Sequence, residues 1–149
     1  MAILIGIDPG EHTGFAVWDT TTRTFLQVQT LMLHQAMDEV KRWNYACLLA
    51  EKAIPFAVIF EDARQRTWFA PERNNAEYRG KLMGAGAAKR DARIWEEFLE
   101  AQHIPYHALK PAPGRTKWNA DYWAHITGWQ GRTSEHARDA ALLVFGRHL

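Results

Sequence analysis

The chain has 149 residues, 47% of them hydrophobic and 23% charged, which predicts a single globular domain over residues 1–149 with a sizeable core. The formal net charge of +1 is too small to identify a partner by itself. The single cysteine, Cys47, excludes an intramolecular disulfide, and the opening residues lack a secretory signal. No apolar run reaches the roughly 18 residues that cross a bilayer. We therefore expect a soluble, cytoplasmic protein with no membrane partner.

Three short strands are expected at the start of the chain. The apolar run ILIGID (3–8) ends in an acid and is followed by the turn cluster PGEHTG (9–14). An extended pattern resumes in FAVWD (15–19), and TRTFLQVQT (22–30) alternates polar residues with β-branched and aromatic ones. Because the connections are short, these strands are expected to form an antiparallel meander.

Helices and strands alternate in the rest of the chain. Apolar runs predict two further strands, FAVIFED (56–62) and IPYHAL (104–109). Helical spacing and capping residues predict four helices, over 34–52, over 75–102, over 117–126, and from a cap at Thr133 or Ser134 towards Arg147. This order predicts an α/β fold of three layers, α/β/α, with helices on both faces of a five-stranded mixed sheet, three antiparallel strands first and then two parallel.

The long predicted helix carries two unusual features. Its middle, GAGAA (84–88), holds two glycines that each cost about 1 kcal/mol relative to alanine, so we expect another backbone to approach closely there. The segment 63–93 holds eight basic residues against three acidic ones. Such an excess is either a solvated helix face or a surface for an anionic partner, and the residues alone leave both interpretations open.

Three acidic residues stand where predicted elements end or begin: Asp8, Glu61 and Asp139. If the first and fourth strands are parallel neighbours, their carboxyl ends open on the same edge of the sheet, where α/β proteins usually bind ligands. Two carboxylates about 4 to 5 Å apart repel each other unless a proton or a cation lies between them, so this placement favours a divalent metal. Asp62 is the alternative to Glu61, because successive side chains of a strand point to opposite faces, and we favour Glu61.

His136 and Asp139 are three residues apart, so they share one helix face and can both point at the same cluster. Oxygen ligands suit Mg²⁺ or Mn²⁺, and an imidazole ligand increases tolerance of Mn²⁺. Two such ions can hydrolyse a phosphodiester. Each residue also has a simpler interpretation: Asp8 before Pro-Gly can be a turn former, and His136 can be a surface or capping residue.

Taken together, IGIDPGEHTGFAVWD (5–19), VIFED (58–62) and SEHARDAALLVFG (134–146) resemble the RuvC family of Holliday-junction resolvases, within the RNase H-like superfamily. The resemblance covers nearly the whole chain. It implies a homodimeric endonuclease that binds four-way DNA junctions in a bacterial or phage-infected cell and nicks two strands symmetrically with Mg²⁺ or Mn²⁺. Asp8, Glu61 and the pair His136 and Asp139 match the family's catalytic metal ligands, although aspartate is commoner than histidine at position 136.

The resemblance also implies basic residues near the scissile phosphates. The candidates are Lys110 and Lys117, and Lys117 is the better match. The family's aromatic residue shortly after the glutamate enters the junction centre, whereas here Arg64 occupies that neighbourhood. Guanidinium groups pair with phosphates and aromatic rings stack on unpaired bases, which extends the candidate nucleic-acid-binding set. Its remaining members are Arg66, Trp68, Phe69, Lys81, Lys89 and Arg90.

Three other functions are compatible with parts of this pattern. An ATP-binding domain of the actin and sugar-kinase type also has a first strand ending in aspartate and a glycine turn, but it needs two related lobes, and 149 residues supply one. A catalytically idle nucleic-acid-binding module is disfavoured because all four ligand-type side chains are present. A nuclease of the same superfamily that cuts RNA or other branched DNA is the strongest alternative.

Overall fold

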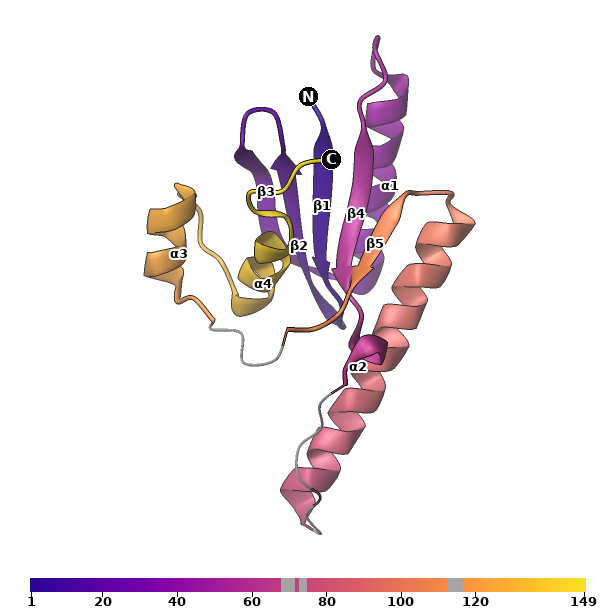
Figure 1. Cartoon of the computed structure of the whole chain (residues 1–149), viewed down its shortest axis with the longest axis vertical. Helices are drawn as coiled ribbons and strands as arrows, with labels where there is room; N and C mark the ends of the chain where they lie inside the picture. The colour runs from indigo at the N-terminus through magenta and orange to yellow at the C-terminus, as the bar shows by residue number, and fades with distance from the viewer. Residues whose placement is uncertain (68–71, 73–74, 113–116) are drawn as a thin grey trace.

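The structure is a computed structural model that describes residues 1–67, 72, 75–112 and 117–149. Five strands form the sheet: β1 (Ile3–Asp8), β2 (His12–Asp19), β3 (Thr24–Met32), β4 (Phe56–Glu61) and β5 (Tyr106–Leu109). Four helices surround it: α1 (Leu33–Leu49), α2 (Ala76–Ala101), α3 (Ala120–Thr127) and α4 (Glu135–Val144). A single 3-10 turn, η1 (Ala63–Gln65), follows β4 (Figure 1).

The strands lie in the order β3-β2-β1-β4-β5. β1, β2 and β3 pair antiparallel, and β4 and β5 continue the sheet parallel to β1. The predicted fold class is therefore confirmed. Ile7 of β1 pairs with Phe60 of β4, so the residues that follow them, Asp8 and Glu61, come to the same edge of the sheet.

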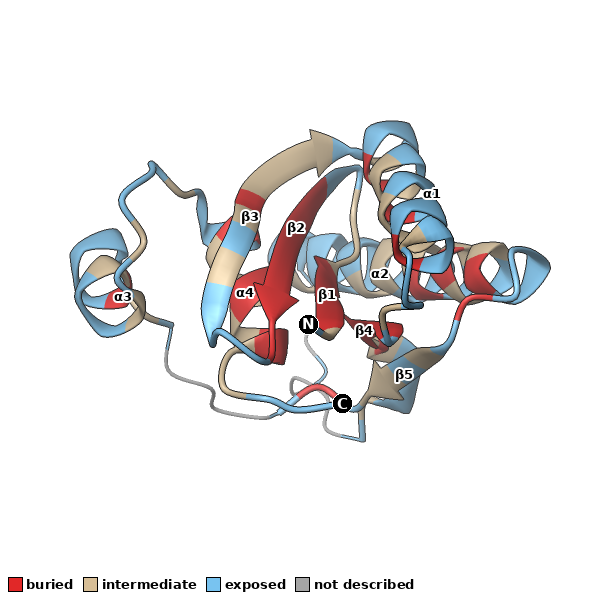
Figure 2. Cartoon of the chain, turned by 90° about the horizontal axis from the view of Figure 1, so that it is seen from above, coloured by how far each residue is buried: buried red, intermediate tan, exposed pale blue. Residues whose placement is uncertain are grey.

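The two faces of the sheet bury different cores. On one face, Ile5 and Val58 pack with Val40 of α1 and Trp95 of α2. On the other, Leu4 and Ile59 pack with residues of α3 and α4 such as Trp123. Figure 2 shows the buried central strands lying between these helices. The alternation of inward and outward side chains along each strand divides the apolar residues between two helical layers.

Two glycines allow α4 to lie directly on the sheet. A Cβ atom on Gly6 of β1 would overlap the carbonyl oxygen of Ala140, and one on Gly14 of β2 would overlap the carbonyl oxygen of His136. Gly14 also pairs with Asp8 in the β1–β2 ladder. Since neither position carries a side chain, the backbone of α4 approaches the strands closely beside Asp8.

The glycines of α2 behave differently from our expectation. A Cβ on Gly84 or Gly86 would meet no atom of the described residues within 4 Å, so no described backbone makes the close approach expected at GAGAA. The amino-terminal half of α2 extends beyond the sheet (Figure 1), and its Leu82 and Met83 are 53% and 78% exposed. Only the second half of α2 contributes buried residues.

Some helix boundaries also differ from the prediction. α3 begins at Ala120 after an Asn119 cap, so Lys117 precedes the helix. Ser134, rather than Thr133, caps α4, which ends at Val144 before Gly146 adopts a positive φ of 73°. None of the helices in the described ranges combines the length and the apolar character that crossing a bilayer requires.

Candidate active site

A cavity of about 470 Å³ opens at the edge of the sheet where β1 and β4 end. Its lining includes every residue that the sequence nominated as catalytic: Asp8, Glu61, Lys117, His136 and Asp139. These side chains come from the ends of two strands, from the segment before α3 and from α4. The fold thus brings together residues that are as far apart in the chain as Asp8 and Asp139.

Asp8 and His136 are in direct contact. The Nδ1 atom of His136 lies 2.9 Å from Oδ2 of Asp8, within hydrogen-bonding distance. This contact depends on Gly14, because the carbonyl oxygen of His136 occupies the space that a side chain at position 14 would need. The close packing of the His136 backbone on Gly14 therefore holds the imidazole beside Asp8 at the end of β1.

Lys117 bridges two carboxylates of α4. Its Nζ atom donates a hydrogen bond to Glu135 and lies 3.2 Å from Oδ2 of Asp139. Glu135 and Asp139 are four residues apart and so lie on the same side of the helix. The hydrogen bond to Glu135 raises the pKa of Lys117 above its usual value, and the contact with Asp139 adds to this effect. Lys117 is therefore a cation throughout the neutral pH range.

Burial raises the pKa of Asp8 above its usual value, and the negative charge of Asp139 raises it further. The hydrogen bond with His136 and the positive charge of Lys117 oppose these effects without cancelling them. The ionised form of Asp8 is therefore under-compensated by the protein itself. A carboxylate in this position gains from an added cation.

Glu61 and Asp62, the two acids at the end of β4, lie in different environments. Glu61 lines the cavity. Asp62 is only 4% exposed and accepts hydrogen bonds from Nε and a terminal nitrogen of Arg64, at 2.8 and 2.9 Å. Arg64 also donates a hydrogen bond of 2.6 Å to Glu96 of α2. Glu61 therefore lines the same cavity as Asp8, whereas Asp62, through Arg64, links β4 and η1 to α2.

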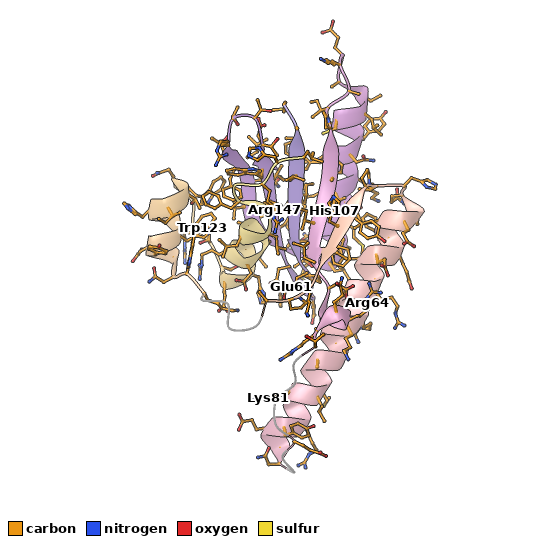
Figure 3. The ribbon with its side chains drawn as sticks, in the orientation of Figure 1. Glu61, Arg64, Lys81, His107, Trp123 and Arg147 are labelled. Atoms are coloured by element: carbon orange, nitrogen blue, oxygen red, sulfur yellow. The ribbon has the colours of Figure 1, made fainter. Side chains whose placement is uncertain are left out.

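The expected nucleic-acid-binding residues occupy several places. Figure 3 shows Arg64 close to Glu61 and Lys81 much further along α2. Arg64 is 30% exposed and engaged by two carboxylates, which limits its capacity to bind phosphate. Arg66 lines the cavity. Trp68 and Phe69 lie outside the described residues.

A second cavity, of about 510 Å³, follows α2 and shares Arg66 and Ala88 with the first. Its remaining lining is formed by residues of the amino-terminal half of α2: Tyr78, Lys81, Leu82, Gly84 and Ala85. Lys81 forms an exposed ion pair with Glu77, at 3.3 Å. The two cavities thus adjoin at Arg66 and Ala88.

The other three candidates lie outside these cavities. Lys89 and Arg90 are exposed on α2, and Arg90 lies 3.6 Å from Asp91. Lys110 is exposed immediately after β5. Of the two lysines considered for a role beside the scissile phosphate, the structure therefore brings only Lys117 to the cavity.

The chemistry of the cavity fits a divalent cation. Three carboxylates and one imidazole supply oxygen and nitrogen donors, and burial raises the pKa of Asp8, so its ionised form would gain from an added cation. Among the described residues, no three His, Cys, Asp or Glu side chains already stand together as a formed metal site. Two of the candidate ligands are engaged with other side chains: Asp8 contacts His136, and Asp139 contacts Lys117.

Sequence reasoning missed two contributors to the site. Glu135 stands at the first position of α4, where an acid commonly interacts with the helix dipole, so its residue type alone gives no signal of a role at the site. Its partner, Lys117, lies 18 residues away in the chain. Gly14 was read as part of a turn cluster, although a glycine within a strand pattern can signal close backbone approach.

Comparison with known proteins adds no assignment. Scans of the chain against protein-family models and against curated protein sequences both give no match.

Proposed function

We propose that this protein is a structure-specific DNA endonuclease that resolves four-way junctions, using two divalent metal ions per active site and acting as a homodimer. One observation carries the proposal: Asp8, Glu61, His136 and Asp139 line a single cavity together with Lys117. The cavity lies at the carboxyl ends of two parallel strands, a position that α/β folds use for ligands.

In this proposal the four ligand-type residues hold Mg²⁺ or Mn²⁺. When bound, the ions supply the activated water and the charge neutralisation that phosphodiester hydrolysis needs. His136 and Asp139, one helical turn apart, donate from α4, while Asp8 and Glu61 donate from the sheet. Lys117 places an ammonium group beside the phosphate, where it stabilises developing negative charge.

The path for the nucleic acid is the second support. Arg66 lines both cavities and Lys81 lines the one along α2, so basic side chains extend from the site along α2. Positive groups spaced along a groove bind a phosphate backbone in a salt-dependent manner. The choice of a four-way junction and the homodimer rest on the sequence resemblance to RuvC resolvases.

The decisive experiment compares four substrates: a four-way junction, a linear duplex, a branched duplex and an RNA–DNA hybrid. The protein, incubated with Mg²⁺ or Mn²⁺, is expected to convert the junction into paired nicked duplexes and to leave the linear duplex intact. Preferential cleavage of the hybrid or of the branched duplex would instead support the alternative, another nuclease of the RNase H-like superfamily.

The matched variant is Asp8→Asn. It should abolish cleavage and retain junction binding, because the amide keeps the shape of the side chain but is a poor metal ligand. Cleavage at the wild-type rate by Asp8→Asn would remove this cavity from the reaction. Junction binding without cleavage by the wild-type protein, with either metal, would favour an idle binding module.

A further inference from the structure

Glu135 lies next to the cavity without lining it. Its carboxylate accepts a hydrogen bond from Nζ of Lys117, and it is much more exposed than Asp139: the side chains are 56% and 21% exposed. Lys117 therefore touches one carboxylate inside the cavity and one outside it. The two lie one helical turn apart on α4, so a small rotation of the lysine side chain can break the contact with Asp139 and keep the one with Glu135.

We propose that Glu135 is a positioning residue that gives Lys117 a second carboxylate partner. The lysine can then leave Asp139 when a divalent cation binds and still remain beside the reacting phosphate. The inference rests on the proposed function, since it concerns the same metal site. An ammonium group and a divalent cation compete for the same oxygen of Asp139. With Glu135 present, losing the contact with Asp139 does not leave Lys117 without a carboxylate.

This arrangement makes opposite predictions for the two partners of one contact. Removing the competing cation in Lys117→Met should tighten Mn²⁺ binding about fivefold, the scale of an exposed ion pair. Removing the second carboxylate partner in Glu135→Gln should weaken Mn²⁺ binding about twofold to fivefold, because Lys117 then stays on Asp139. Isothermal titration of the full chain with Mn²⁺, in the absence of nucleic acid, measures both.

Glu135→Gln also removes a negative charge near the site, and a double variant separates that effect from positioning. If Glu135 acts through Lys117, then Glu135→Gln should leave the Mn²⁺ dissociation constant unchanged in a Lys117→Met background. An equal loss of affinity in both backgrounds would show that Glu135 acts only by its charge, and would overturn the proposal. Titration near 0.15 M salt reduces the long-range contribution.

Arg132→Met is the charge-matched control for Lys117→Met. Arg132 is exposed near the start of α4 but does not line the cavity, so its loss should not change Mn²⁺ affinity. An equal increase in Mn²⁺ affinity in Arg132→Met and Lys117→Met would contradict the competition between Lys117 and the metal for Asp139. If the wild-type chain binds no Mn²⁺ at all, the proposed function fails and this inference fails with it. Intact Mn²⁺ binding with no change in Lys117→Met removes only the inference.

Discussion

His136 Nδ1 lies 2.9 Å from Oδ2 of Asp8, so the last helix and the first strand, 128 residues apart in the chain, meet in one contact at the edge of the sheet. The contact brings a nitrogen donor to a carboxylate whose raised pKa reflects burial and the nearby charge of Asp139. Each of these features suits a metal-binding edge, and each can be tested separately.

The imidazole should set the metal preference. In His136→Asp, an oxygen ligand replaces a nitrogen ligand, so the ratio of the cleavage rate with Mn²⁺ to that with Mg²⁺ should fall about threefold to tenfold. Rates measured at saturating concentrations of each metal provide the ratio. An unchanged ratio would remove the imidazole from the metal shell while leaving the three carboxylates in place.

Gly14 should be intolerant of even one added methyl group. The Cβ of Gly14→Ala would overlap the carbonyl oxygen of His136, so α4 must shift, at a cost of about 1 to 3 kcal/mol in unfolding free energy. Urea denaturation measures this loss. Gly80→Ala is the matched control: a Cβ there meets no described atom within 4 Å, so it should stabilise α2 by roughly 0.5 to 1 kcal/mol.

Neutralising Asp8 should stabilise the metal-free protein while abolishing activity. Burial, followed by the charge of Asp139, raises the pKa of Asp8 in the folded state above its unfolded value. The stability associated with the protonated form is present below the unfolded pKa and is lost as the pH rises through the folded pKa. At pH 8 we therefore expect Asp8→Asn to raise Tm by about 2 to 4 °C.

Differential scanning calorimetry without metal, repeated at pH 3 and pH 8, checks this prediction. The gain in Tm from Asp8→Asn should be largest at pH 8 and shrink at pH 3, where the wild-type carboxyl is protonated in both states. Adding Mn²⁺ should raise the Tm of the wild-type protein more than that of Asp8→Asn. A lower Tm for the variant at pH 8 would contradict the assigned electrostatics.

Substitutions of Arg64 and Arg66 test two different quantities, the free energy of unfolding and the affinity for junction DNA. Arg64→Met leaves the buried Asp62 without its guanidinium partner and should cost about 1 to 2 kcal/mol, since water reaches part of the pair. Arg66→Met, at the shared wall of the two cavities, should weaken junction binding and reduce its dependence on salt. Urea denaturation and binding titrations at several salt concentrations distinguish the two effects.

The Asp62 contact should also make stability depend on acid pH. Burial alone would raise the pKa of Asp62, but the hydrogen bonds from Arg64 outweigh it and hold the pKa below its usual value. The contribution of the carboxylate is therefore fully present above the unfolded pKa, near 3.9, and is lost as the pH falls through the folded pKa. Arg64→Met should flatten this acid limb of the stability curve.

A large side chain in the second cavity, along α2, should lower the affinity for junction DNA. Gly84 lines the second cavity and Gly80 does not, although both are helical and neither has a described atom in its Cβ environment. Gly84→Leu should therefore lower junction affinity about fivefold to tenfold, whereas Gly80→Leu should leave it unchanged. Both substitutions favour the helix, so a parallel loss of affinity in the two variants would exclude this path for the nucleic acid.

Much of the fold could be predicted because its signals are local. Continuous apolar runs at Ile3–Asp8 and Phe56–Glu61 identify strands, and parallel pairing of those strands is enough to bring Asp8 and Glu61 to one edge. The spacing of His136 and Asp139 identifies a shared helix face for the same reason: side-chain direction repeats with the geometry of the element. The strands and the shared helix face follow from near neighbours in the chain, whereas the parallel pairing joins segments that are far apart in it.

The remaining features were decided only by tertiary structure, because they depend on which distant surfaces meet. The apolar residues of α1 illustrate this: Val40 is buried, whereas Tyr45 and Leu48 are exposed, since packing reaches only part of the helix. The glycines of α2 look locally like those of the strands, yet a Cβ on Gly14 would meet a helix backbone and one on Gly84 would meet no described atom within 4 Å. No periodicity distinguishes these cases.

The candidate site shows the same division. The sequence by itself determined the kinds of side chain and their positions at strand ends and on one helix face, since these are local properties, whereas the pairing of β1 with β4 brings them to one edge. Only the tertiary structure decided that Arg64 is held by Asp62 and Glu96, and that Lys117 is shared between Glu135 and Asp139. Ion pairs between segments form according to distance and burial in the folded chain, and neither quantity is encoded in sequence spacing.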